Sequence, residues 1–226
     1  MLGRIGEPLL LLVVPAVLFG CAWFDVEASA ALTLLVTIAT LVLALLGYER
    51  SRPQLRDIVP TATLAAVAAA GRVLFAPLPY VKPVTAITII AGSTLGRRNG
   101  FMVGALAALV SNAFFGQGPW TPWQMYAWGL VGYLSGILPL ERGRVLPYLW
   151  GVGSALLYGG ILNGWYAIGF VRPLTWQGIL VAYGAGVPLD VIHGVSTAGF
   201  LVVLWGRLRR AIARVVAKYG LLEEDS

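Results

Sequence analysis

Charge and the usual catalytic side chains are scarce in this chain of 226 residues. Only 12% of the residues are Asp, Glu, Lys or Arg, and there is one cysteine, Cys21, and one histidine, His193. A single cysteine excludes an internal disulfide and a cysteine-rich metal site, and a single histidine argues against a histidine metal centre. The sequence also lacks a phosphate-binding Gly-Lys-Ser/Thr loop and an HExxH motif. It therefore predicts neither an ATPase nor a metal enzyme, and no cofactor.

Apolar residues dominate the chain instead. They make up 58% of the sequence, a share typical of a polytopic membrane protein. The net charge of +6 would suit nucleic acid only if basic residues clustered on a soluble face with groups that read bases. Here they lie between apolar segments. Membrane lipid, and not nucleic acid, is therefore the expected partner of the basic surface.

The apolar residues form eight segments that we interpret as membrane helices, of which 83–95 is short. The first segment has some features of a signal peptide, with Cys21 placed as in a lipoprotein cleavage site. A second apolar segment follows at once, and this favours a transmembrane hairpin. The eight predicted spans are 8–23, 28–47, 58–76, 83–95, 101–115, 123–138, 146–170 and 187–206.

These segments divide the chain into four parts. Residues 1–48 form the N-terminal transmembrane hairpin, 49–57 a basic cytoplasmic linker, and 58–206 a six-helix core. Residues 207–226 form an amphipathic cytoplasmic tail suited to anionic headgroups. The sequence does not assign residues 175–186 to a span, and an interfacial helix is one interpretation of this segment. The expected fold class is an all-α polytopic membrane protein.

The distribution of positive charge sets the expected orientation. With both termini in the cytoplasm, the inner segments hold 13 of the 16 Lys and Arg residues, Lys82 and Arg172 lie outside, and Arg72 lies within a span. The positive-inside rule favours this arrangement. The expected location is the bacterial cytoplasmic membrane, with the loops 76–83, 115–122 and 170–176 on its outer side.

The residues best suited to ligand contact gather on that outer side. Residues 111–124 read SNAFFGQGPWTPWQ and join two apolar segments. Non-helical backbone at a membrane boundary is tolerated where it lines a cavity or meets water, so this run is predicted to be a binding loop. An aromatic belt at the interface is the alternative for its tryptophans. The candidate substrate-binding residues are Tyr80, Lys82, Asn112, Gln117, Trp120, Trp123, Gln124, Trp128, Asn163, Trp165, Asp190 and His193.

Two charged residues, Arg72 and Asp190, fall in the outer thirds of predicted spans. Charges at such a depth usually face the bundle interior and pair with one another or with substrate. We expect a structural ion pair between Arg72 and Asp190, with a ligand clamp as the alternative.

A stripe of alanines marks another surface of the span 58–76. Ala62, Ala66 and Ala70 repeat every four residues and give a smooth helix face that another helix can approach closely. The stripe is either a docking surface for a partner or a site of tight packing within the chain.

The sequence contains no evident catalytic constellation. The lone His193 is a poor partner for Ser196 as a nucleophile. The alternative function is an integral membrane enzyme acting on a lipid or isoprenoid-like substrate, and it depends on Arg72, Asp190 and His193. An aromatic-rich pocket with few titratable groups favours binding over catalysis.

Residues 61–204 resemble the substrate-binding S components of energy-coupling factor (ECF) vitamin transporters. The similarity covers the Ala-rich first core helix, the outer loop LPYVKPV at 78–84 and the inner turn GSTLGRRNG at 92–100. It continues through residues 112–128 and GVPLDVIH at 186–193. The resemblance implies a six-helix core across 58–206, to which the hairpin is an addition.

The resemblance also implies a function. Such a chain captures a vitamin at the outer face and works with a membrane T component and two cytoplasmic ATPases, without being an enzyme itself. The positions Ala62, Ala66 and Ala70 match the small-residue motif used against the T component. The run 111–124 is most similar to cobalamin-type members, with riboflavin or another flat heterocycle next.

Overall fold

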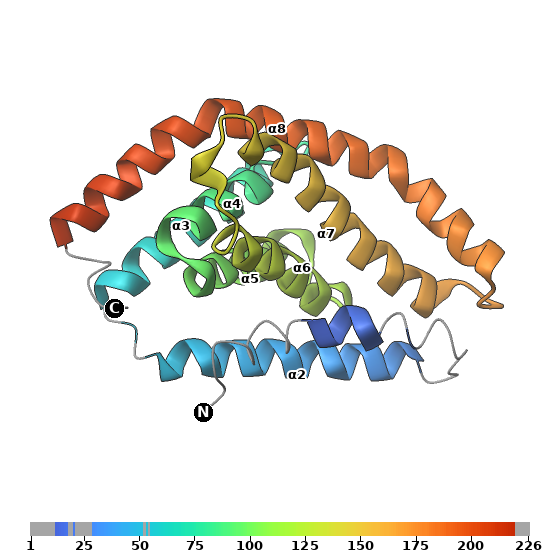
Figure 1. Cartoon of the computed structure of the whole chain (residues 1–226). Coiled ribbons are helices and arrows are strands. Elements are labelled where there is room, and N and C mark those ends of the chain that lie inside the picture. Colours follow the sequence, from blue (N-terminus) through green and yellow to red (C-terminus); the bar gives the residue numbers. More distant parts are fainter. Residues whose placement is uncertain (1–11, 18–19, 21–28, 52, 54, 220–226) are drawn as a thin grey trace.

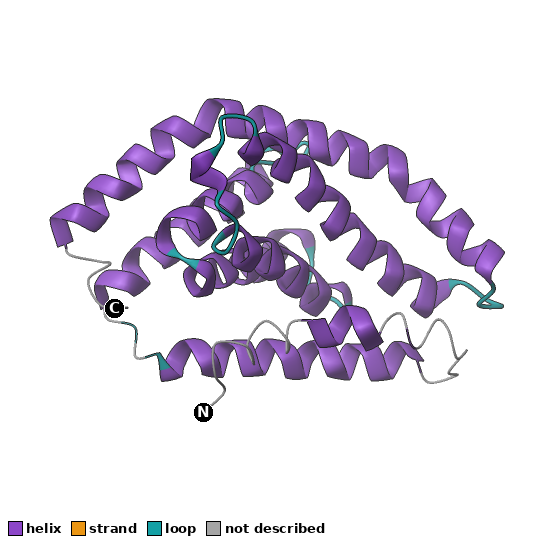
Figure 2. Ribbon diagram, viewed as in Figure 1, coloured by secondary structure: helices purple, strands orange, loops and turns teal. Residues whose placement is uncertain are grey.

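The computed structural model describes residues 12–17, 20, 29–51, 53 and 55–219. Over these residues the chain is helical and has no strand, which confirms the predicted all-α class (Figure 2). A short helical segment at 12–17 precedes the longer elements. These are α2 (Ser29–Arg50), α3 (Leu55–Leu74), α4 (Val84–Leu95), α5 (Arg97–Phe115), α6 (Trp120–Ser135), the 3-10 helix η1 (Leu140–Arg142), α7 (Leu146–Phe170) and α8 (Trp176–Tyr219).

Helix α4 lies at the centre of the bundle. Nearly all of its side chains are buried, including an unbroken run from Val84 to Ala91. Its 12 residues span about 18 Å at 1.5 Å per residue, which is less than the hydrocarbon core of about 30 Å. The segment predicted as a short membrane span at 83–95 is therefore a buried helix of 12 residues, too short to cross the hydrocarbon core by itself.

Glycines allow α4, α5 and α6 to pack with their backbones close together. A Cβ atom at Gly132 would overlap the carbonyl oxygen of Gly100, and one at Gly92 would overlap the carbonyl oxygen of Gly132. A Cβ atom at Gly104 would likewise overlap the backbone of Trp128. Small residues at a helix interface permit this approach. The three helices therefore form a fixed frame that carries residues 111–124 at one end.

Helix α3 presents two faces of alanine with different surroundings. Leu64, Ala65, Ala68 and Ala69 are buried against the bundle. The stripe of Ala62, Ala66 and Ala70 is exposed. The stripe is therefore not used for packing within the described part of the chain, and it is left free for contact with another molecule.

Helix α8 is a single helix of 44 residues. It arches over one side of the bundle, while α2 runs along the opposite side (Figure 1). The sequence suggested a separate segment at 175–186 and a separate tail after residue 206, but α8 continues through both positions. Pro188 lies inside the helix without ending it. At about 1.5 Å per residue, α8 is about twice as long as a membrane crossing requires.

Two of the described helices are long and apolar enough to cross a membrane, over residues Asp57–Leu74 and Trp176–Lys218. In the predicted N-terminal hairpin, the second span corresponds to α2, which contacts α6 and α7. Most of the first span, and the acidic end of the predicted tail, lie outside the described residues.

Candidate ligand-binding site

Arg72 is the centre of a polar cluster at one end of the bundle. It lies in the last turn of α3, and only 8% of its surface is exposed. Its Nη1 donates to Ser111 Oγ and to Asn112 Oδ1, both at 2.6 Å. Its Nε is buried without a hydrogen-bond partner among the described residues. The cluster therefore holds a buried cation with an unused donor.

The Asn112 amide extends the cluster from α5 to α6. Its Nδ2 donates to Thr121 Oγ1 at 3.1 Å and to Gln124 Oε1 at 2.8 Å. Gln117 supports the same turn, because its side chain donates to the Leu109 carbonyl and accepts from Thr121. The run 111–124 was predicted to be a non-helical loop, but only 116–119 lie outside helices, because α5 ends at Phe115 and α6 begins at Trp120. The chain reverses there in a hydrogen-bonded turn, with Gly116 at φ +93° where a side chain would be strained.

Aromatic rings surround the Arg72 guanidinium. Its Cζ lies 4.7 Å from the Phe115 ring centre and 5.0 Å from that of Trp128, within cation-π range. Trp128 in turn stacks on Tyr158 of α7, with ring centres 4.5 Å apart. Gln124 is a hydrogen-bonding neighbour of the Tyr158 hydroxyl. Four helices, α3, α5, α6 and α7, therefore contribute to one polar and aromatic cluster.

His193 on α8 joins this cluster through Thr85 at the start of α4. The Trp128 indole N–H donates to Thr85 Oγ1 at 3.0 Å, and the same oxygen lies 2.7 Å from His193 Nε2. The hydroxyl accepts from the indole and can give its own proton to a neutral imidazole. Tyr158 packs edge-on against His193. His193 is thus a buried, hydrogen-bonded packing residue at the base of the site.

Asp190 has a different environment from Arg72. Its Oδ2 accepts a hydrogen bond from Asn163 Nδ2 at 3.0 Å, and its carboxylate packs directly over Gly159. The predicted ion pair between Arg72 and Asp190 is not formed, because each residue has neutral partners of its own. Tyr158 is within electrostatic reach of both charges.

Four predicted residues lie at the rim of the site or beyond it. Tyr80 is 40% exposed and has φ +61°, and Trp120 is 36% exposed. Lys82 is half-buried, with its Nζ 5.3 Å from the same Phe115 ring that faces Arg72. Trp165 is half-buried and packs edge-on against Phe170.

Trp123 does not lie at the rim as predicted. Its side chain is fully buried in the core, and its indole N–H has no hydrogen-bond partner among the described residues. Its packing in the core is the correction to that prediction.

Sequence reasoning did not select Thr85, Ser111, Phe115 or Tyr158 as site residues. Ser111 and Phe115 were visible as members of the run 111–124. Thr85 and Tyr158 carried no local signal, because their roles depend on which helix faces meet.

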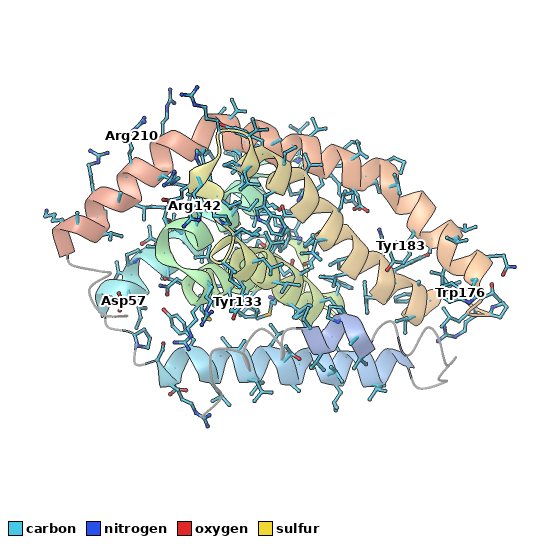
Figure 3. All side chains as sticks on the ribbon, in the orientation of Figure 1. Asp57, Tyr133, Arg142, Trp176, Tyr183 and Arg210 are labelled. Carbon is cyan, nitrogen blue, oxygen red and sulfur yellow. The ribbon has the colours of Figure 1, made fainter. Side chains whose placement is uncertain are left out.

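A hollow lies away from the Arg72 cluster, between α7, α8 and the N-terminal segment. Its volume is about 500 Å³, and its walls are almost entirely apolar. Tyr183 donates to the Gly160 carbonyl beside it (Figure 3). The residues that line it are Pro15, Leu156, Leu157, Gly160, Ile161, Gly164, Ala167, Ile168, Trp176, Ile179 and Tyr183. None of the Arg72 cluster belongs to this lining.

The fold and the site together define an all-helical protein with a buried cation, amides and aromatic rings at one end of its bundle. A model described as "Family of unknown function (DUF6580)" matches residues 52–218, and the chain belongs to this family. No curated protein and no solved structure matches the chain. The match begins inside the linker predicted at 49–57, so residues 1–48 lie outside it.

Proposed function

We propose that this chain is a membrane protein that binds a vitamin-sized, ring-containing micronutrient for uptake. The observation that carries the proposal is the convergence of Arg72, Asn112, Gln124, Trp128 and Tyr158 at one end of the bundle. Ligand sites combine apolar and aromatic walls with a few well-placed polar groups. This cluster has that composition, and Phe115 and Trp120 beside it are exposed.

The exposed surface supports a location in the membrane. Large apolar side chains stand on the outside of α2 and α8, including Leu35, Leu180, Val181, Val202 and Val203, each at least 57% exposed. Contiguous apolar surface of this kind marks contact with lipid or protein. Two helices also have the length and hydropathy of membrane spans.

The proposed orientation follows from the distribution of charged and aromatic residues. Arg142 and Arg210 lie at one end of the molecule and Trp176 at the other (Figure 3). We place the Arg142 end in the cytoplasm, in line with the positive-inside rule. Arg72 is near the end of α3, and Asn112 near the end of α5, so both then lie toward the outer side.

Within this proposal the chain acts as an S component of an ECF transporter. It captures the vitamin, and a T component with two ATPases drives uptake. The exposed stripe of Ala62, Ala66 and Ala70 offers a smooth helix face for the T component. Cobalamin is the favoured substrate, with riboflavin or another flat heterocycle next.

Native mass spectrometry of the full chain, purified in mild detergent, tests the binding step. We expect a co-purified compound of vitamin mass that is retained without nucleotide. In proteoliposomes, we expect uptake of that compound only when a T component and two ATPase subunits are supplied. Uptake by the chain alone would overturn the proposal. A chemically altered lipid or isoprenoid, with no vitamin retained, would favour the membrane enzyme instead.

A pair of α3 variants tests the partner surface. Ala66→Trp places bulk on the exposed stripe and should abolish energised uptake while leaving ligand binding and thermal stability unchanged. Ala69→Trp is the matched control on the buried face, and it should lower thermal stability because the core has no room for the ring. Equal loss of binding and uptake in Ala66→Trp would assign the stripe to a role within the chain.

A further inference from the structure

Two cations share one exposed ring at the candidate site. Arg72 Cζ lies 4.7 Å from the Phe115 ring centre, and Lys82 Nζ lies 5.3 Å from it. Phe115 itself is 41% exposed, so this place is open to a ligand. Arg72 is more than nine-tenths buried, and its Nε has no hydrogen-bond partner. The pair therefore concentrates positive charge beside an unused donor.

No carboxylate of the described residues balances this charge. The described acidic residues are Glu49, Asp57, Glu141 and Asp190. Neither Arg72 nor Lys82 forms a salt bridge with any of them, and Glu141 pairs with Arg209. Burial, and then the nearby Arg72, lower the pKa of Lys82. The protein itself thus disfavours positive charge at this position.

Keeping an unpaired buried cation is costly, because desolvation of the charge is not repaid by an opposite charge. The last turns of α3 and α5 end close to Arg72, and their carbonyl groups offset part of the cost through the helix dipoles. They do not provide a partner for Nε. A group from outside the described chain would supply one.

We propose that the ligand of this site carries an anionic group, a carboxylate or a phosphate, attached to a flat ring system. The anion lies beside Lys82 and the Arg72 guanidinium, whose Nε is buried in the ligand-free structure, and the ring packs against the exposed Phe115. Hydrogen bonds between a guanidinium and such anions are about twice as strong as neutral ones. This inference rests on the proposed binding function and narrows its substrate class. It favours vitamins with a phosphate diester or a carboxylate over neutral heterocycles such as riboflavin.

Two small probes that share a ring and differ in charge test the inference. The full chain in nanodiscs of phosphatidylcholine alone is titrated with benzoate and with benzamide, and thermal unfolding is followed. We expect benzoate to bind about 10-fold more tightly, and the preference to weaken as salt is raised. Equal affinity for the two probes would overturn the inference.

Variants of Arg72 and Lys82 test whether the preference for benzoate over benzamide arises at this site. Arg72→Gln removes the charge and keeps donors for Ser111 and Asn112, so it should abolish the preference for benzoate. Lys82→Met changes a half-buried loop residue outside the helices, and it should reduce the preference even if Arg72→Gln fails to fold. An unchanged preference in Lys82→Met and in any folded Arg72→Gln protein would overturn the inference.

An anionic lipid headgroup would offer the same chemistry as an anionic vitamin. A third experiment distinguishes these two sources of the anion. Nanodiscs that contain phosphatidylglycerol are compared with those of phosphatidylcholine alone. Stabilisation by phosphatidylglycerol that depends on Arg72, without any effect of benzoate, would assign the site to lipid and overturn the inference. A co-purified neutral vitamin would keep the proposed function and overturn the anionic class. A preference for benzoate without any co-purified vitamin or uptake would keep the anionic class of ligand and overturn the proposed uptake function.

Discussion

The two buried charges of the bundle, Arg72 and Asp190, are held in opposite ways. Asp190 accepts a hydrogen bond from Asn163, and Gly159 leaves just enough room for its carboxylate. Arg72 donates to Ser111 and Asn112, keeps Nε unused and lies beside an exposed ring. Asp190 has a tight contact with the α7 backbone at Gly159, whereas Arg72 has an unused donor beside an exposed ring. Burial of a charge therefore does not by itself distinguish a structural group from a binding group.

The difference lies in the shape and number of the polar atoms. A carboxylate at a tight helix contact is enclosed by one amide and the neighbouring backbone. A guanidinium has five N–H donors in a fixed fork, and a packed helix end rarely supplies five acceptors. The unused donor at Arg72 follows from this excess. It makes the Arg72 region the better place for a ligand.

The largest expected effect comes from Trp128, which contacts Arg72, Thr85 and Tyr158. Trp128→Ala removes the ring beside Arg72 and the indole N–H bonded to Thr85, and it should cost about 3 to 5 kcal/mol of unfolding free energy. Trp128→Phe keeps a ring and loses only the N–H, so it should cost much less and leave ligand affinity nearly intact. Chemical unfolding measures the free energy of unfolding of each variant, and ligand titration measures its affinity. An equal loss of stability in both variants would show that the ring itself contributes little.

The packing of Asp190 is tested by two neighbouring glycines on α7. Gly159→Ala places a Cβ atom against the Asp190 carboxylate and should lower the unfolding free energy by about 1 to 3 kcal/mol. Gly160→Ala has no atom within 4 Å of the new methyl and should be neutral or stabilising by up to about 1 kcal/mol. Thermal unfolding compares them. Similar melting temperatures for the two variants would mean that the Asp190 region has free space after all.

The independence of the two charges is tested by a double-mutant cycle. Arg72→Gln and Asp190→Asn should have additive effects on unfolding free energy to within about 0.5 kcal/mol, because the two residues share no hydrogen-bond partner. Tyr158 is the one group within electrostatic reach of both, and it sets the small coupling that is expected. A coupling well above 1 kcal/mol would restore the direct ion pair that the sequence suggested.

The sequence pointed to the end of the bundle at which the polar and aromatic cluster lies, because residues 111–124 differ in composition from the apolar segments around them. It identified Asn112, Gln124 and Trp128, whose polar and aromatic character is visible locally. It did not find the partners of Arg72, since these depend on how α3 meets α5, and α5 is held by backbone contact with α4 and α6. Trp123 and Trp128 look alike in sequence, yet only the packed bundle places one in the core and the other beside Arg72.

Some helix boundaries also differ from those predicted, because local sequence does not show how the helices pack. The all-helical class follows from apolar content and segment length. The continuity of α8 does not, because Gly186 and Pro188 indicate a break in an isolated segment. A proline inside a helix can be accommodated by bending, and α8 is visibly curved (Figure 1).

The smallest expected effect is a pH dependence of stability at Lys82. Its pKa in the folded chain is lowered by burial and then by Arg72, whereas the unfolded chain has the ordinary value of about 10.4. Between these two values the unfolded state binds more protons, so the stability of the ligand-free protein should rise with pH across this window.

Lys82→Met should flatten this rise, and Arg72→Gln should weaken it, because one of the two causes of the lowered pKa is then removed. Unfolding in denaturant at a series of pH values measures the slope. The effect is small because Lys82 is only half-buried and water screens its charge. An identical slope in the wild-type and Lys82→Met proteins would mean that Lys82 and Arg72 do not share one electrostatic environment, and the contrast with the enclosed Asp190 would then depend on Arg72 alone.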